Sequence, residues 1–227
     1  MLKTAMYFAD AFLILTLFGI TCEIAGRIFQ ALTNSSDTTE AGGKQLPLRL
    51  LVQIGEFTIC LHWSVFVVVV CFVLGLTHDD IESSTFTLVS IACMVSVLII
   101  LAHELGHALT CRLVGAKVYG VFVSYFCGVC YTEGTDSRLK AILIYASGPF
   151  ANLCILVIAL LALPDPWSNF DYAVWWALVP FNTYMIVWNL IPRTFGEIST
   201  DGFHILHHIR NYRVPMTAPL QLDHQTQ

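Results

Sequence analysis

The sequence predicts an all-α polytopic membrane protein with about five transmembrane helices and a short β-hairpin or re-entrant segment. Of its 227 residues, 56% are hydrophobic and only 12% are charged, and the mean hydropathy is +0.71. Soluble domains are less apolar than this. Several apolar stretches approach or exceed the roughly 20 residues of helix that cross a bilayer. One further segment is rich in β-branched and aromatic residues, as strands are.

The first predicted span needs separate justification because it follows Lys3, as the apolar part of a secretory signal would. It contains Asp10 and lacks a clear small-residue cleavage site, so we interpret it as a retained span. The predicted spans are residues 5–24, 61–77, 85–111, 139–163 and 172–191.

The predicted spans, together with the linker between the first and second span, divide the chain into four parts. Residues 1–32 are expected to form an N-terminal transmembrane helix. Residues 33–49 are a predicted linker, since LTNSSDTTEAGGKQ is polar, rich in Ser, Thr and Gly, and without periodicity. Residues 50–210 are the predicted core, and residues 211–227 a flexible tail.

Basic residues occur on alternate connections between the predicted spans. The second and fourth connections, THDDIESS and PDPWSNFD, have no Lys or Arg, whereas the others do. Because cytoplasmic flanks carry the positive excess, this pattern predicts an outside N-terminus and a cytoplasmic C-terminus. The net charge of −5 indicates no particular partner, and without a basic run we expect no nucleic-acid partner.

The segment LAHELGHALT, residues 101–110, places three ionisable groups inside the third span. Such a group costs roughly 2.5–3.5 kcal/mol on insertion scales, so it usually faces a cavity and has a function. His103 and His107 share one helix face and can both direct a ring nitrogen at one zinc ion, while Glu104 can reach a water beside it. The alternative is two buried histidines that hydrogen-bond between helices, with Glu104 in a water-filled crevice.

A catalytic zinc site normally has three protein ligands and a water, so a third ligand is needed. The acidic candidates are Glu133 in a loop, Glu197, and Asp201 just past the last span. His204 and His208 form a second pair at helical spacing that could also bind metal. At the start of a polar tail, however, these two histidines are expected to sit in solvent.

Three motifs taken together resemble the site-2 protease family of intramembrane zinc metalloproteases, peptidase family M50. They are LAHELGHALT, SGPFANL and NLIPRTFGEISTDGFHIL, which occur in the family's order. In addition, GEFTICLHWSVFVVVV is similar to the family's short extended piece before its first core span. The resemblance covers about residues 50–210 and implies the compact, sporulation-factor-protease-like form, without the PDZ or CBS domain of some members.

The resemblance implies roles for individual residues. His103 and His107 match the zinc-binding histidines, Glu104 matches the general base, and Asp201 matches the third metal ligand. Asn152 matches an asparagine that helps to hold substrate or the developing oxyanion. The residue-based alternative for Asn152 is a polar contact between helices.

The last motif departs from the family pattern. Asn189 and Pro192 match the asparagine and proline before the Asp-Gly pair, although a helix contact and a helix stop would also explain them. The segment RTFGEIST places eight residues between Pro192 and Asp201, which is more than relatives have. Phe203 stands where a second glycine is common. The longer loop keeps Glu197 open as an alternative ligand.

The implied function is hydrolysis of a peptide bond within or next to a transmembrane segment of a membrane-bound substrate. Zinc-activated water would attack the bond and Glu104 would act as general base. The implied cofactor is one Zn²⁺ per chain. The expected partners are a transmembrane protein substrate, the lipid bilayer and a regulatory membrane protein. The small size suggests a multi-pass protein of a bacterial plasma membrane, with the active site towards the cytoplasmic side.

The segment AKVYGVFVSYFCGVCYTEG, residues 116–134, is too short and too broken for a span. We predict a hairpin or re-entrant strand pair beside the active site, whose edge pairs with an extended substrate. A hairpin on the membrane surface is the alternative. Cys127 and Cys130 form a CxxC here, which we interpret as small apolar residues because further metal ligands and thioredoxin-like surroundings are lacking.

Two other classes of function remain open from the sequence. A metal or proton transporter would place coordinating residues on several spans along a path, whereas here they gather at one depth. A binding or scaffold protein derived from a protease would have lost the base or a ligand, whereas Glu104 and both histidines are present.

Overall fold

The computed structural model describes residues 49–54, 57–76, 85–124, 127–163, 168–195 and 198–212. The chain divides into two compact units, Met1–Leu46 and Pro47–Gln227, and all described residues belong to the second unit. The predicted N-terminal span, the linker up to residue 48 and the tail beyond residue 212 lie outside the described residues.

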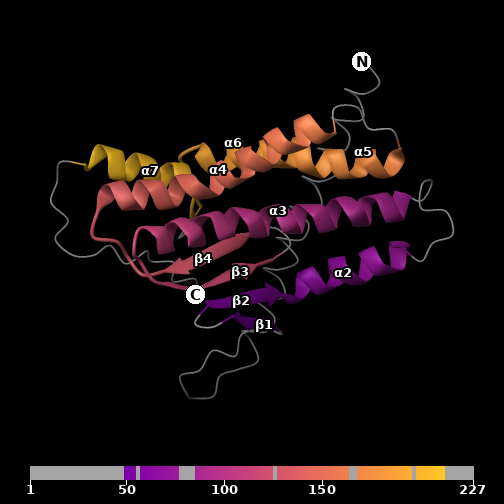
Figure 1. Cartoon of the computed structure of the whole chain (residues 1–227), viewed down its shortest axis with the longest axis horizontal. Helices are drawn as coiled ribbons and strands as arrows, with labels where there is room; N and C mark the ends of the chain where they lie inside the picture. The colour runs from indigo at the N-terminus through magenta and orange to yellow at the C-terminus, as the bar shows by residue number, and fades with distance from the viewer. Residues whose placement is uncertain are drawn as a thin grey trace. The chain divides into compact units, whose positions relative to one another are not determined.

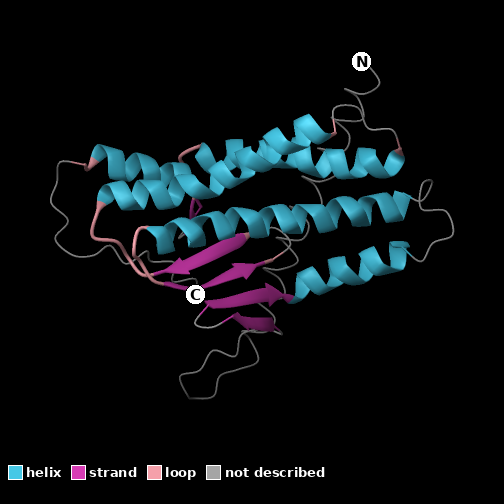
Figure 2. Ribbon diagram, viewed as in Figure 1, coloured by secondary structure: helices cyan, strands magenta, loops and turns pink. Residues whose placement is uncertain are grey.

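Helices make up most of the described chain (Figures 1 and 2). Two segments, Phe86–Leu113 and Arg138–Ala162, are long and apolar enough to cross a membrane, and Ser64–Leu74 is a shorter apolar helix. The predicted spans at 85–111 and 139–163 are confirmed as helices, whereas the predicted span at 61–77 is helical only from residue 63 to 76, because residues 61 and 62 end a strand. The helices are α2 (Trp63–Leu76), α3 (Thr85–Leu113), α4 (Arg138–Ala162), α5 (Asn169–Trp176), the π-helical η1 (Ala177–Phe181), α6 (Asn182–Leu190) and α7 (Asp201–Arg210).

The predicted span at 172–191 consists of three consecutive helical segments, α5, η1 and α6. The start of α5 is fixed by a capping box, in which Ser168 and Asp171 each accept a hydrogen bond from the other's backbone N–H. Pro180 lies inside η1. Proline cannot donate a helical hydrogen bond, and a short π-helical turn accommodates such an interruption.

A four-stranded sheet corrects the all-α prediction. Its order is β1-β2-β3-β4, with β2 and β3 parallel and the outer pairs antiparallel. The predicted hairpin at 116–134 is present as β3 and β4, whereas β1 was not predicted. Six-residue apolar runs such as RLLVQI show too little periodicity to be assigned reliably. The strands are β1 (Arg49–Ile54), β2 (Phe57–His62), β3 (Val118–Val123) and β4 (Gly128–Thr132).

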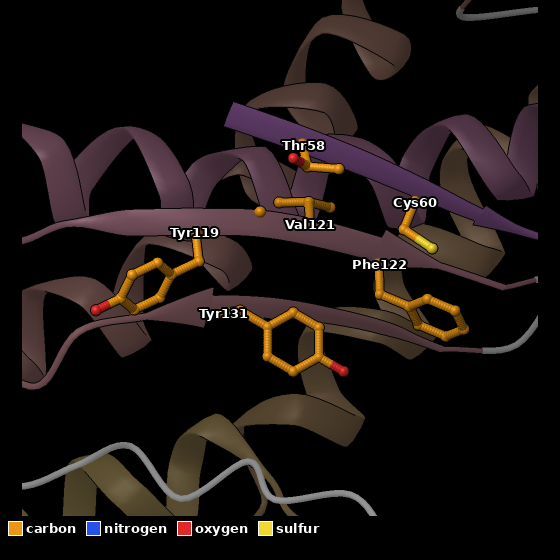
Figure 3. Close-up of a pocket in the computed structure, with 7 residues that line it drawn as sticks. Thr58, Cys60, Tyr119, Val121, Phe122 and Tyr131 are labelled. Carbon is orange, nitrogen blue, oxygen red and sulfur yellow. The ribbon is translucent and has the colours of Figure 1, made fainter. Parts of the chain in front are cut away.

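α3 lies between the sheet and α4 (Figure 1), and it contacts β3 and β4 on one side and α4 on the other. Val121, Val123 and Cys130 point from the sheet into the core against α3. Alternate residues face the other way. On that second face, Phe122 and Tyr131 help to line a shallow apolar hollow of about 140 Å³ (Figure 3).

Candidate metal centre

The two histidines of the third predicted span lie together on α3. Their Nε2 atoms are 3.2 Å apart, and both side chains are buried. Gly106 lies between them in sequence and lets α4 approach closely, because a Cβ at this position would lie 2.7 Å from the carbonyl oxygen of Ser147. The helix that carries the candidate ligands is therefore packed directly against α4.

One turn of α4, residues 144–148, holds the histidine pair. The carbonyl oxygen of Ile144 lies 2.7 Å from Nδ1 of His107. A hydrogen bond donated by Nδ1 orients the ring and leaves Nε2 as the ligand atom. A Cβ at Gly148 would overlap Nε2 of His107 and lie 2.6 Å from Nε2 of His103, so only glycine fits here. The glycine of SGPFANL thus makes room for the histidine pair.

Asp201 begins α7 and completes the cluster. Its Oδ2 lies 3.2 Å from Nε2 of His103, and its Oδ1 lies 3.4 Å from Nε2 of His107. Burial alone would raise the pKa of Asp201, but the charges and hydrogen bonds of the two histidines hold this pKa below its ordinary value. A carboxyl group binds a metal ion in its ionised form.

The lengthened loop before Asp201 is folded so that its ends meet. β5 (Thr194–Phe195) and β6 (Ile198–Ser199) form a small antiparallel hairpin. Thr200 closes this hairpin, since its hydroxyl donates to the carbonyl oxygen of Ile191 at 2.7 Å and accepts from the backbone N–H of Arg193 at 3.1 Å. The described residues of this loop therefore pair as a hairpin, and Asp201 lies within 3.4 Å of both histidine nitrogens.

Two further contacts fix the start of α7. The side chain of Thr200 caps the helix by accepting from the backbone N–H of Phe203. A Cβ at Gly202 would overlap the carbonyl group of Leu190, so glycine lets the first turn of α7 approach the end of α6. Glu197, the alternative ligand, lies outside the described residues.

The cluster is a possible site for a metal ion such as zinc. A tetrahedral site with bonds of about 2.0–2.1 Å places its ligand atoms about 3.3–3.4 Å apart. The two histidine nitrogens are 3.2 Å apart, and each lies near a different oxygen of Asp201, at 3.2 Å for His103 and 3.4 Å for His107. With one ligand atom from each residue, the three atoms lie within 4.8 Å of one another, so a small closure around the ion would complete tetrahedral spacing. Two imidazoles and one carboxylate are also a common donor set of catalytic zinc sites.

Glu104 is on α3, next to His103, and its side chain faces the start of β4. Its side chain is 6% exposed, and the backbone of Cys130 hydrogen-bonds its carboxyl group. A Cβ at Gly128 would overlap this side chain, so the glycine lets the strand approach the carboxyl group. The candidate base therefore lies between the histidines and the sheet.

Asn152 follows Gly148 by one turn of α4. It is fully buried, and within the described part of the chain neither its amide nitrogen nor its amide oxygen has a hydrogen-bond partner. A buried amide without a partner is costly, so both of its polar atoms are available for a further hydrogen bond. Asn189 instead donates to the carbonyl oxygen of Met185 in its own helix, and Pro192 follows the end of α6, as a helix stop should.

The remaining candidates lie apart from the cluster. The side chain of Glu133 is exposed. The expectation that His204 and His208 sit in solvent is wrong, because His204 stacks on Tyr145 and His208 is 2% exposed. The sequence also showed no sign that Asn182, at the start of α6, has a fully buried amide side chain.

The CxxC pair consists of one exposed and one buried thiol. Cys127 is exposed near the hairpin turn, and Cys130 is buried against α3. Burial raises the pKa of Cys130, which keeps its thiol protonated and unreactive. Within the described ranges, His103, His107 and Asp201 form the group of three potential ligands that the fold brings together.

Comparison with known proteins identifies the family. Residues 64–207 match the family model described as Peptidase M50B-like. The chain belongs to the M50B-like peptidases. The matched range contains the histidine pair, Glu104, Asn152 and Asp201. This chain is therefore a metalloprotease of the M50 family.

The fold of this M50B-like peptidase is also found in a solved structure, the site-2 protease from Methanocaldococcus jannaschii. The TM-score is 0.50 at 20% sequence identity, over 74% of this chain and 73% of the other. No curated protein sequence matches the chain. The shared fold and the two membrane-length helices indicate an integral membrane protein.

Proposed function

We propose that this M50B-like peptidase hydrolyses a peptide bond within or next to a transmembrane segment of a membrane-bound protein. His103, His107 and Asp201 hold one Zn²⁺, and Glu104 is the general base. The observation that carries the proposal is the convergence of the two Nε2 atoms and the Asp201 carboxylate at separations of 3.2–3.4 Å. Glu104 lies directly beside this group.

Each residue has a defined part in the reaction. A zinc ion held by His103, His107 and Asp201 would polarise a water and lower its pKa towards 7. Glu104 accepts a proton from this water and delivers it to the leaving amine. Asn152 has a buried amide nitrogen available to donate a hydrogen bond to the carbonyl oxygen on which negative charge develops.

The sheet supports an extended substrate. In the order β1-β2-β3-β4, β4 has a free edge among the described strands. Such an edge can pair with an added strand. Gly128 at the start of β4 is in contact with Glu104, so a substrate paired with this edge passes the base. A transmembrane substrate must unwind locally to bind in this way, since its helix otherwise keeps the backbone groups paired.

The placement of basic residues supports an active site near the cytoplasmic side. Arg112 lies in the last turn of α3, just beyond His107, and Lys140 lies in the first turn of α4. The positive-inside pattern places these ends in the cytoplasm. We place the protein in a bacterial plasma membrane, as a multi-pass protein. Its proposed parts are a transmembrane helix in residues 1–32, a linker in 33–49, the metalloprotease core in 50–210 and a tail in 211–227. A regulatory membrane protein is a further proposed partner.

The proposal is tested by metal removal. Treatment of the detergent-purified protein with a chelator should abolish cleavage of a membrane-spanning substrate peptide, because the activated water is lost with the ion. Addition of one equivalent of Zn²⁺ should restore cleavage. The measurement is cleavage of a fluorescent transmembrane peptide, with bound metal determined in parallel. Full activity in protein shown to be free of metal would contradict the proposal.

A further inference from the structure

The turn of α4 that holds the histidines also contacts α7. Ile144 and Gly148 face the histidine pair, as described above. Tyr145, in the same turn, is only 5% exposed and packs against α7. Since α7 begins with Asp201, a single turn of α4 contacts both elements that supply the candidate ligands.

The contact between α4 and α7 is a stack of aromatic rings. The ring of Tyr145 lies 4.3 Å from that of His204 with an interplanar angle of 7°, and 6.0 Å from that of His208 with an angle of 25°. His204 and His208 follow Asp201 by three and seven positions, so all three share one helix face. The rotation of α7 that brings both imidazoles onto Tyr145 also turns Asp201 towards the histidine pair.

A helix of ten residues depends on such packing. Isolated helices of this length are only marginally stable in water, so their stability and orientation come from tertiary contacts. Thr200 and Gly202 fix only the first turn of α7. Beyond this turn, His204 and His208 pack on Tyr145 of α4, and His208 is only 2% exposed.

We propose that Tyr145, His204 and His208 are positioning residues for the third metal ligand. Their stacked rings set the rotation of α7 and place Asp201 against His103 and His107. This inference rests on the proposed metal site. The ring of Tyr145 makes the contacts with His204 and His208, so the positioning role belongs to the ring.

The test compares substitutions that remove the ring with substitutions that keep it. Tyr145→Leu and His204→Leu should weaken zinc binding by about 10–100-fold, the cost typical of losing a group that orients a ligand. Tyr145→Phe and His204→Phe should bind zinc as the unmodified protein does. The measurement is competition for Zn²⁺ with a chelating indicator in detergent, and it needs no substrate.

Tyr184→Leu is the matched control. Tyr184 stacks on Trp188 within α6, with ring centroids 5.7 Å apart and no part in the proposed site. Its loss should leave the zinc affinity unchanged. If Tyr145→Leu does not fold, His204→Leu tests the same contact from the less buried side, with helical circular dichroism as the check on folding.

The outcomes separate this inference from the proposed function. Unchanged zinc affinity in folded Tyr145→Leu and His204→Leu would overturn the positioning role while leaving the metal site intact. Equal losses in the Phe and Leu variants would also overturn it, because the ring would then not be the feature that matters. Failure of the unmodified protein to bind zinc would overturn the metal site itself, and this inference with it.

Discussion

Glu104→Gln is expected to abolish cleavage while zinc stays bound. Glutamine keeps the size and most of the contacts of the side chain between α3 and β4, but it cannot accept a proton from water. Loss of a general base typically costs about 10²–10⁴-fold in rate. The measurement is cleavage of a transmembrane substrate together with the zinc content of the same preparation.

The matched control for this variant is Glu133→Gln, which removes a carboxylate of the same type from an exposed position after β4. It should cleave at the rate of the unmodified protein. Undiminished cleavage by Glu104→Gln would refute the assigned role of Glu104. Loss of zinc together with activity would instead indicate that Glu104 helps to bind the metal.

Asp201→Ala should remove the third ligand and greatly weaken zinc binding. Two imidazoles from one helix turn remain, which is fewer than the three protein ligands of a catalytic zinc site. The loss should exceed the roughly 10–100-fold that follows when only a supporting partner is removed. Equilibrium dialysis against buffered Zn²⁺ measures the affinity directly.

Glu197→Ala provides the comparison, because Glu197 is the other acidic candidate in the lengthened loop. It should retain zinc affinity and activity. The reverse result, with normal binding in Asp201→Ala and loss in Glu197→Ala, would assign the third ligand to the loop.

The histidine pair could be predicted from sequence because its geometry is local. Residues four apart on a helix face the same way in any protein, so the spacing of His103 and His107 fixes their relation. The structure agrees, with the two Nε2 atoms 3.2 Å apart. Asp201 lies 98 residues from His103 in the chain, and no local periodicity links the two. Only the resemblance to a family favoured Asp201 over Glu133 and Glu197.

The contacts that hold the site were not predictable from the sequence. A carbonyl oxygen such as that of Ile144 has no signature in the side-chain pattern, because every residue has one. The closure of the long loop by Thr200 depends on a hairpin of only two paired residues per strand. The stack of Tyr145 on His204 joins helices distant in sequence, and near a polar tail histidines are normally solvated.

The sheet was predicted in part for a similar reason. The hairpin of β3 and β4 is local, and its alternating apolar residues and glycines indicate it. The parallel pairing of β2 with β3 joins strands separated by α2 and α3. Such a pairing depends on how the helices pack and cannot be found from the strand sequences alone.

X-ray absorption spectroscopy at the zinc edge tests the central claim most directly. The detergent-purified protein, loaded with one equivalent of Zn²⁺, should show a shell of nitrogen and oxygen ligands at about 2.0–2.1 Å, with two imidazole contributions and no sulfur. Asp201→Ala should lose this ordered shell. A sulfur shell near 2.3 Å, which would indicate cysteine ligands, or the same shell in Asp201→Ala, would contradict a zinc site formed by His103, His107 and Asp201.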